Sequence, residues 1–191
     1  IEKCFRPQWL DAVAPEAQDL IYLSGYQTDE RNADFIAALL ERKRPDARIL
    51  FDPGPCADRI PQAMKEAVLA ANAILKVNAS EARVLAPAAD VETSARTLSL
   101  STGCPVVVTD GARGALVVEG EEMLRVPGFP VHVVDTIGSG DAHAGGMLAG
   151  LMCGFPLPEA VLLGNAVASW VTGEEGGASA PNAARLRARH A

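Results

Sequence analysis

Short apolar runs alternate along the chain with longer segments in which apolar residues recur at helical spacing. The runs predict strands at residues 17–23, 48–51, 74–77, 105–109, 114–118, 123–126 and 131–134. The helical spacing predicts helices at residues 29–44, 60–71, 80–85, 92–99, 158–172 and 182–189, with a further apolar helix after residue 141. Such alternation predicts βαβ units in a mainly parallel sheet that is covered on both faces. We therefore expect one α/β domain over residues 1–191.

The composition narrows the class of partner. Of the 191 residues, 49% are apolar and 21% charged, which suits a packed core and excludes wholesale disorder. The net charge of −7 argues against a nucleic-acid partner, because such partners are met by clustered Lys and Arg. The four cysteines are scattered without a CxxC pair, so we interpret them as buried thiols rather than a disulfide framework. The start of the chain shows no signal-peptide pattern, and we expect a cytoplasmic protein.

One stretch resembles a membrane span in composition alone. Residues 142–158 contain no Asp, Glu, Lys or Arg, and four glycines lie among them. Pro156 and Pro158 end the apolar helix well short of the length that crosses a bilayer. The pattern therefore favours a buried helix, and we expect no membrane partner.

The strongest chemical signal lies at residues 133–143, which read Val-Val-Asp-Thr-Ile-Gly-Ser-Gly-Asp-Ala-His. We interpret this segment as a buried strand that enters a glycine-rich turn, which in turn opens a helix. The free N–H groups and positive dipole end of a helix start form an anion site, and Gly138 and Gly140 let the backbone approach the anion. Asp141 falls in the first helical turn, where a carboxylate is stabilised and can accept a proton.

Two familiar phosphate loops do not fit this segment. A P-loop requires a Lys directly after its glycines, and none is present here. A dinucleotide-binding loop requires a third Gly, where this chain has His143, and Asp141 would face the pyrophosphate; a Rossmann oxidoreductase is thereby excluded. The alternative that remains open is structural, with Asp141 capping the helix and the glycines only turning the chain.

Residues 135–141, Asp-Thr-Ile-Gly-Ser-Gly-Asp, resemble the C-terminal signature of the ribokinase-like (PfkB) carbohydrate kinases, usually DTxGAGD. Three further segments resemble the family's motifs in the family's order. They are residues 78–81 (NxxE), residues 108–115 (VTxGxxGA) and residues 164–168, which resemble the helix beside the adenine. The resemblance implies a three-layer α/β/α ribokinase-like fold and ATP-dependent phosphorylation of a hydroxyl of a sugar or sugar-like substrate.

The resemblance also implies roles at the site of phosphoryl transfer. Asp141 would be the base that takes the proton from the acceptor hydroxyl. The N–H groups of Gly138, Ser139 and Gly140 would form the anion hole for the transferring phosphoryl group. Asn78 and Glu81 would hold Mg²⁺ through its waters; the alternative from spacing alone is a plain helix cap with a capping-box Glu.

Further implied roles concern the nucleotide and a monovalent cation such as K⁺. Residues that would line the ATP are Thr109, Gly111, Gly114 and, near the base, Asn165. Asp135 and backbone carbonyls near Ile137 and Gly177 would bind the cation. Because ligands of parallel sheets bind beyond the carboxyl ends of the strands, we expect residues 78–81, 109–114, 135–141 and 165–177 to converge on one cleft.

Three residues keep two interpretations each. Asp52 is either a strand-end residue near the phosphates or a turn cap. Tyr26 is either a substrate contact or a half-buried packing residue. His143, where family members often carry Phe, either contacts ligand or is a packed, hydrogen-bonded His; we favour the second.

Members of the family have a further N-terminal region that supplies the first strands, a sugar-binding segment and a β lid, and none of it is recognisable here. We therefore interpret residues 1–191 as the C-terminal, nucleotide- and phosphate-binding portion of such a kinase. A nucleoside kinase and a non-catalytic nucleotide- or sugar-binding module are the alternatives, and a homodimer is compatible with either. The intact Asp141 argues against the module, since a pure binder needs no base there.

Overall fold

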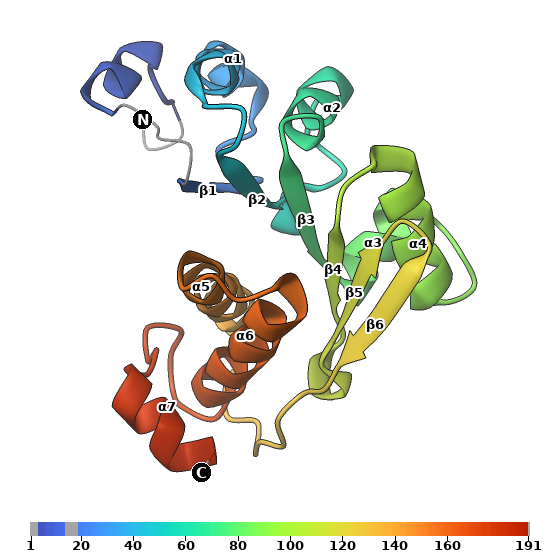
Figure 1. The fold of residues 1–191 in the computed structure, drawn as a ribbon, viewed down its shortest axis with the longest axis vertical. Coiled ribbons are helices and arrows are strands. Elements are labelled where there is room, and N and C mark those ends of the chain that lie inside the picture. Colours follow the sequence, from blue (N-terminus) through green and yellow to red (C-terminus); the bar gives the residue numbers. More distant parts are fainter. Residues whose placement is uncertain (1–3, 14–18, 191) are drawn as a thin grey trace. The chain divides into compact units, whose positions relative to one another are not determined.

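The computed structural model describes residues 4–13 and 19–190, and its helices and strands alternate along the chain (Figure 1). The strands are β1 (Leu20–Ser24), β2 (Arg48–Asp52), β3 (Ala73–Asn78), β4 (Val106–Thr109), β5 (Ala115–Glu119) and β6 (Glu122–Val126). The α-helices are α1 (Ala33–Arg42), α2 (Gln62–Leu69), α3 (Ala79–Leu85), α4 (Val91–Thr102), α5 (Ser139–Met152), α6 (Leu157–Thr172) and α7 (Ala183–His190). Short 3₁₀ turns are η1 (Pro7–Ala12), η2 (Glu30–Asn32), η3 (Gly54–Cys56) and η4 (Gly111–Arg113).

The six strands are hydrogen-bonded in the order β1-β2-β3-β4-β5-β6. β1 pairs with β2 and β2 with β3 in parallel, with Leu23 opposite Phe51 and Phe51 opposite Leu75. The predicted alternation of strands and helices is thus confirmed, with most boundaries within a few residues. Part of the first predicted strand, residues 17 and 18, lies outside the described residues.

The chain divides into two compact units, each described by itself below. Unit 1 comprises Ile1–Val108 and Val118–Met123, and unit 2 comprises Thr109–Val117 and Leu124–Ala191. The single domain expected from the sequence stays a prediction.

Unit 1 is built on the parallel strands β1, β2 and β3, with α1 and α2 side by side along them (Figure 1). Phe51, Ile74 and Val77 are almost completely buried, as expected of strands that are covered on both faces. The ends of these strands present Asp52 and Asn78.

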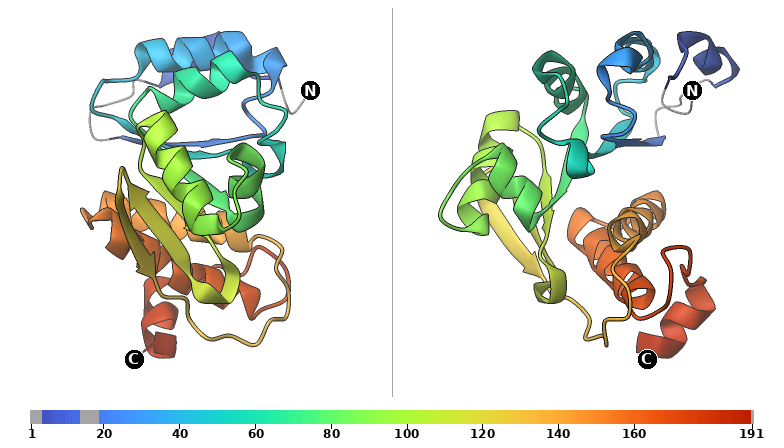
Figure 2. Two further views of the ribbon diagram at one scale, coloured as in Figure 1. Left: turned by 90° about the vertical axis from the view of Figure 1, so that its right-hand side faces the viewer. Right: turned by 180° about the vertical axis from the view of Figure 1, so that it is seen from behind.

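Unit 2 is dominated by α5 and α6, which pack side by side in every view (Figure 2). Their backbones approach so closely that a Cβ on Gly146 would lie 2.8 Å from the Cα of Gly164, and a Cβ on Gly150 would lie 2.9 Å from the Cα of Ala160. The uncharged, glycine-studded stretch is therefore a helix–helix interface. Within the described residues, no helix combines the length and apolar character that crossing a bilayer requires.

The strand predicted at residues 131–134 is wrong. These residues form an irregular segment in which Val133 and Val134 are 58% and 50% exposed. The N–H groups of Val134 and Asp135 donate to the carbonyl oxygen of Thr172, at 2.9 and 3.2 Å. Because those amides are paired with the end of a helix instead of a strand, the glycine loop is entered from an exposed segment and not from a buried strand.

The prediction about cysteines is only partly confirmed. All four are free thiols, so no disulfide joins them. Cys104 is buried and its thiol donates to the carbonyl oxygen of Leu69 at 3.0 Å, whereas Cys4 and Cys153 are exposed. Composition alone could not show that these two cysteines fall on the surface.

Candidate active site

The glycine loop of unit 2 ends at Gly138, which precedes the first residue of α5. Gly138 has φ +76°, and a Cβ there would lie 2.7 Å from the Cα of Gly177. Both facts require glycine, because an L side chain would be strained and would collide with backbone. The loop is therefore shaped by its contact with the segment that contains Gly177.

The N–H groups at the helix start, which were expected to form an anion site, differ in their partners. The N–H of Ser139 donates to the carbonyl oxygen of Thr136 at 3.2 Å, so this expected donor is already paired within the turn. The amides of Gly140 and Asp141 follow in the first turn, where N–H groups have no intrahelical acceptor. Asp141 is exposed at this helix start, where its carboxylate can meet a ligand.

A cavity of about 440 Å³ lies within unit 2 beside this loop. It is lined by small residues of the η4 turn, by residues 128–131 and by the first turns of α5 and the last turns of α6. Six residues predicted for nucleotide or phosphate are brought together in its wall: Thr109, Gly111, Gly114, Ser139, Gly140 and Asn165. The volume of the cavity falls in the range of small-molecule sites. The individual roles of these six residues stay predictions.

Asn165 joins three elements around this cavity. Its side-chain oxygen Oδ1 lies 3.1 Å from Nε2 of His143 on α5, and its Nδ2 donates to the carbonyl oxygens of Val126 and Pro127 at 3.3 and 3.0 Å. Because Nδ2 is a donor, Oδ1 accepts, and His143 donates through Nε2. His143 is 2% exposed, so the prediction of a packed, hydrogen-bonded His is confirmed. Asn165, which the family resemblance placed near the adenine, thus holds the wall of the cavity through its side-chain amide.

The η4 turn is held by an ion cluster that sequence reasoning missed. Asp110 accepts from Arg113 at 2.8 Å through both of its carboxylate oxygens and from Arg125 at 3.3 Å. The hydrogen bond from Arg113 is the main cause that lowers the pKa of Asp110 below its usual value, with Arg125 adding to it. At Gly114, φ is +84° and a Cβ would lie 2.1 Å from the carbonyl oxygen of Val126, so only glycine fits. The ion cluster and this glycine together fix the turn against the cavity.

In unit 1, Asn78 and Glu81 form a complete capping box at the start of α3. Oδ1 of Asn78 accepts from the N–H groups of Ser80 and Glu81, both at 2.9 Å, and Oε2 of Glu81 accepts from the N–H of Asn78 at 2.8 Å. The helix cap with a capping-box Glu, the alternative to a metal site in the sequence analysis, is therefore present in the structure. Over residues 4–13 and 19–190, no three His, Cys, Asp or Glu side chains are grouped as metal ligands. A Mg²⁺ role for this pair, through water, stays a prediction.

Asp52 and Lys76 form a buried ion pair at the ends of β2 and β3. Nζ of Lys76 lies 2.6 Å from Oδ2 of Asp52, with the two side chains 4% and 11% exposed. Oδ1 of Asp52 accepts from the N–H of Gly54 at 3.2 Å, which confirms the turn cap. Sequence reasoning missed Lys76, although a Lys inside the apolar run of residues 74–77 was a signal that could have been followed.

The remaining predicted residues are placed as follows. Tyr26 is 55% exposed, close to the half-burial expected of a packing residue, and it lines a cavity of unit 1 together with Arg31 and Arg59. Oδ1 of Asp135 accepts from the N–H of Ile137 at 2.9 Å, so the carboxylate shapes its own loop. The carbonyl oxygen of Ile137 lies 3.0 Å from the Cβ position of Gly177, so the structure does bring these two backbone segments together.

The sequence pattern of the pfkB family carbohydrate kinases matches residues 3–184. The chain belongs to this family. The glycine loop, the η4 turn and the end of α6 that surround the unit 2 cavity all lie within the matched region.

Individual relatives agree with the family assignment. An uncharacterized sugar kinase of Escherichia coli, YegV, is 37% identical over 194 residues, which cover all of this chain and 60% of YegV. A cytidine kinase of Thermococcus kodakarensis is 44% identical over 89 residues, which cover 46% of this chain and 32% of that protein. This chain therefore spans about three fifths of the YegV sequence and less of the cytidine kinase.

Solved structures confirm the fold class predicted from the sequence. Aminoimidazole riboside kinase from Salmonella enterica, in complex with aminoimidazole riboside and an ATP analogue, has a TM-score of 0.80 at 25% identity, covering 97% of this chain and 66% of that one. Ribokinase from Thermotoga maritima has a TM-score of 0.73 at 25% identity, covering 89% of this chain and 56% of that one. The fold is the three-layer α/β/α ribokinase-like fold.

Proposed function

We propose that the protein is an ATP-dependent kinase that phosphorylates a hydroxyl of a sugar or sugar-like small molecule. The observation that carries the proposal is the unit 2 cavity, where the residues predicted for the nucleotide share one wall with Ser139 and Gly140 at the start of α5. A helix start favours negative charge through its free amides and its dipole. Asp141, in the same first turn, is then next to any phosphate bound there.

The cavity wall suits a nucleotide. Four glycines and two alanines are among its seventeen lining residues, and at these positions a planar base can approach the backbone closely. The contacts of Asn165 and His143 hold this wall rigid before any ligand binds. A preorganised cavity lowers the entropic cost of binding, and we assign the ATP to it.

The chemistry requires positioning and charge stabilisation more than covalent participation. Asp141 takes the proton from the acceptor hydroxyl, and the first-turn amides of α5 stabilise the charge on the transferring phosphoryl group. Mg²⁺, when bound, neutralises charge on the phosphates; Asn78 and Glu81, with their carboxylate and amide oxygens, are the residues assigned to hold it through water. Asp135 and the carbonyls of Ile137 and Gly177 are assigned to a monovalent cation such as K⁺.

The relatives differ most in the acceptor molecule for which they are named. YegV is described as a sugar kinase, whereas the Thermococcus and Salmonella relatives are a cytidine kinase and an aminoimidazole riboside kinase. A nucleoside kinase is therefore the second candidate. All of these acceptors share a ribose- or hexose-like polyol with a reactive hydroxyl.

The test is a substrate screen with the full-length protein, ATP and Mg²⁺, in which ADP release is coupled to a spectroscopic readout. Free sugars, sugar acids, polyols and nucleosides form the panel. The proposal predicts acceptor-dependent ADP release with at least one of them, and its loss in Asp141→Asn. Tight nucleotide binding without turnover on any acceptor would contradict it and favour the non-catalytic module.

A further inference from the structure

We propose that Thr172, the last residue of α6, is a positioning residue of the phosphate-binding loop and that it acts through Ser139. This inference rests on the proposed function and goes beyond it, since sequence reasoning assigned Thr172 only to the end of a helix. Every contact that supports it lies within unit 2.

The backbone of Thr172 holds the start of the loop. Its carbonyl oxygen accepts from the N–H groups of Val134 and Asp135, at 2.9 and 3.2 Å. The last carbonyls of an α-helix have no intrahelical donor, so this one is available to a neighbouring segment. The segment that the sequence predicted as a strand is thus paired with the end of α6.

The side chain of Thr172 holds the end of the same loop. Its Oγ1 lies 2.8 Å from Oγ of Ser139, the first residue of α5, and both residues line the unit 2 cavity. Thr172 therefore contacts both ends of the segment 134–139: its backbone carbonyl binds the start, and its hydroxyl binds the end. Because Ser139 is the first residue of α5, this contact keeps the first-turn amides of Gly140 and Asp141 aimed in one direction, which is what preorganised stabilisation of a phosphoryl group requires.

The hydroxyl of Ser139 is what allows this contact. The signature that the loop resembles usually has Ala at the corresponding position, and Ala has no hydroxyl to offer. Here the two hydroxyl groups form a pair in which either one donates. The pair joins residues 33 positions apart and is partly buried, so water competes with it only in part.

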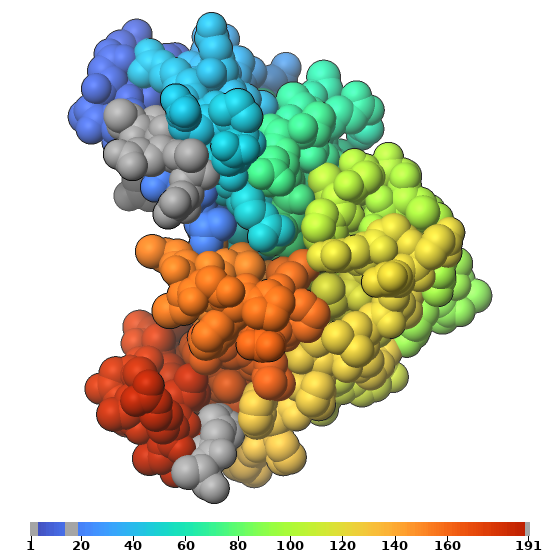
Figure 3. All heavy atoms as spheres, viewed as in Figure 1, coloured from blue at the N-terminus to red at the C-terminus, as the bar shows by residue number. Residues whose placement is uncertain are grey.

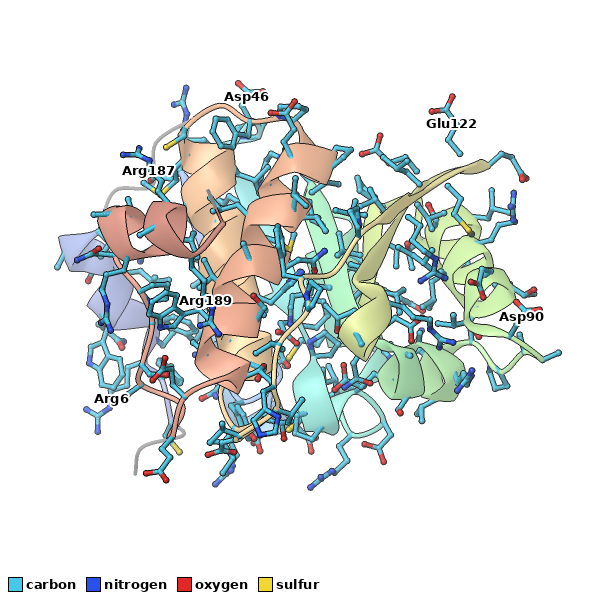
Figure 4. All side chains as sticks on the ribbon, turned by 90° about the horizontal axis from the view of Figure 1, so that it is seen from below. Arg6, Asp46, Asp90, Glu122, Arg187 and Arg189 are labelled. Atoms are coloured by element: carbon cyan, nitrogen blue, oxygen red, sulfur yellow. The ribbon has the colours of Figure 1, made fainter. Side chains whose placement is uncertain are left out.

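The helix α6 also contacts α7, whose atoms are red in Figure 3. The guanidinium groups of Arg185 and Arg189 lie over the ring of Trp170, 5.0 and 4.8 Å from its centroid. In Figure 4, Arg189 lies against α6, whereas Arg187 points away from it. Cation–π contacts of this kind stabilise the helix end that carries Thr172.

The experiment is a double-mutant cycle on turnover in the full-length protein. Thr172→Val removes the hydroxyl and keeps the shape, and Ser139→Ala removes its partner. Thr172→Ser is the conservative variant that keeps a hydroxyl. Thr102→Val is the matched control, because Thr102 is also the last residue of a helix, α4, and its Oγ1 donates to the carbonyl of Leu98 within that helix.

Thr172→Val is expected to lower kcat roughly tenfold, since a small displacement of positioned groups is costly to rate. Its KM for ATP should change far less, because Asn165, the residue assigned near the adenine, keeps its contacts with His143 and Pro127. Ser139→Ala should lower kcat similarly, and the double variant should be no slower than either single one, as contacting residues are non-additive. Thr172→Ser and Thr102→Val should keep the wild-type kcat.

Other results would overturn the inference. One is a kcat of Thr172→Val within about twofold of the wild type. Another is a double variant whose loss of kcat is the product of the two single losses. A third is a kcat of Thr172→Ser as low as that of Thr172→Val. If Thr172→Val does not fold, Ser139→Ala carries the test, and wild-type kcat in it overturns the inference. An inactive wild type would refute the proposed function and this role with it, whereas an active wild type with unaffected variants would refute this role alone.

Discussion

The ammonium of Lys76 and the carboxylate of Asp52 lie 2.6 Å apart, on neighbouring parallel strands and largely out of reach of water. The register that sets Phe51 opposite Leu75 carries these two residues into the same row. A buried ion pair stabilises a fold little more than two apolar residues at the same positions would. Removing one partner, however, leaves the other charge buried without an opposite charge beside it.

We therefore expect Lys76→Met to lower the free energy of unfolding by about 3–5 kcal/mol, because the carboxylate of Asp52 stays buried alone. Urea unfolding of the full-length protein measures this. The double variant Asp52→Leu with Lys76→Met should recover most of the loss. A double variant no more stable than Lys76→Met would show that the pair itself is not the cause.

The second prediction concerns Asp110 and pH. Its pKa is lowered in the folded protein, so its contribution to stability is present above the ordinary carboxyl pKa and is lost as the pH falls through the lower folded-state value. Asp110→Asn should cost about 1 kcal/mol at neutral pH, where Arg113 and Arg125 lose their charged acceptor. The difference in the free energy of unfolding between wild type and variant should become smaller below about pH 4.

Urea unfolding at neutral pH and near pH 3 measures that difference for Asp110→Asn. Asp34→Asn is the control, because Asp34 is exposed in the first turn of α1 and its substitution also removes one carboxylate but leaves the ion cluster intact. A difference for Asp110→Asn that is unchanged across the pH range would contradict the ion cluster as its source.

The third prediction separates two glycines with similar backbones. Gly138 has φ +76° and Gly120 has φ +60°, but only at Gly138 would a Cβ meet other atoms, 2.7 Å from the Cα of Gly177. Both Ala variants carry the cost of a left-handed residue, about 1–2 kcal/mol. Gly138→Ala should in addition displace the phosphate loop, so turnover should fall there and stay at the wild-type level in Gly120→Ala. Equal turnover in the two variants would contradict the tight contact with Gly177.

The sequence was sufficient for features that depend on local pattern. The strand predicted at residues 48–51 and the helix predicted after the glycine turn follow from local pattern, and the structure has them at residues 48–52 and from Ser139 onward. Residues 131–134 include three Val, yet the N–H groups of Val134 and of the following Asp135 donate to Thr172 and not to a strand. A run of apolar residues records β-propensity, whereas the presence of a pairing partner depends on the rest of the fold.

The residues of the candidate site were likewise predictable only where they belong to one local motif. Residues within one motif, such as Asn78 and Glu81, could be named from spacing, although that spacing fits both a capping box and a metal site. Lys76 and Thr172 were missed, because their partners lie 24 and 33 residues away in the chain and no local pattern records them. That Asn78 and Glu81 face the glycine loop of unit 2 stays a prediction.

The central claim is that Asp141 is the base of a phosphoryl transfer and not merely a residue at a helix start. Asp141→Asn keeps the size of the side chain and removes its ability to take a proton. In the full-length protein, with an acceptor found in the screen, kcat should fall about 100- to 10,000-fold. The Kd for ATP, measured by calorimetry, should stay near the wild-type value or tighten, since a negative charge beside the phosphates is gone. If Asp141→Asn instead keeps more than about a tenth of the wild-type kcat, Asp141 is a helix-start residue and the mechanism is wrong.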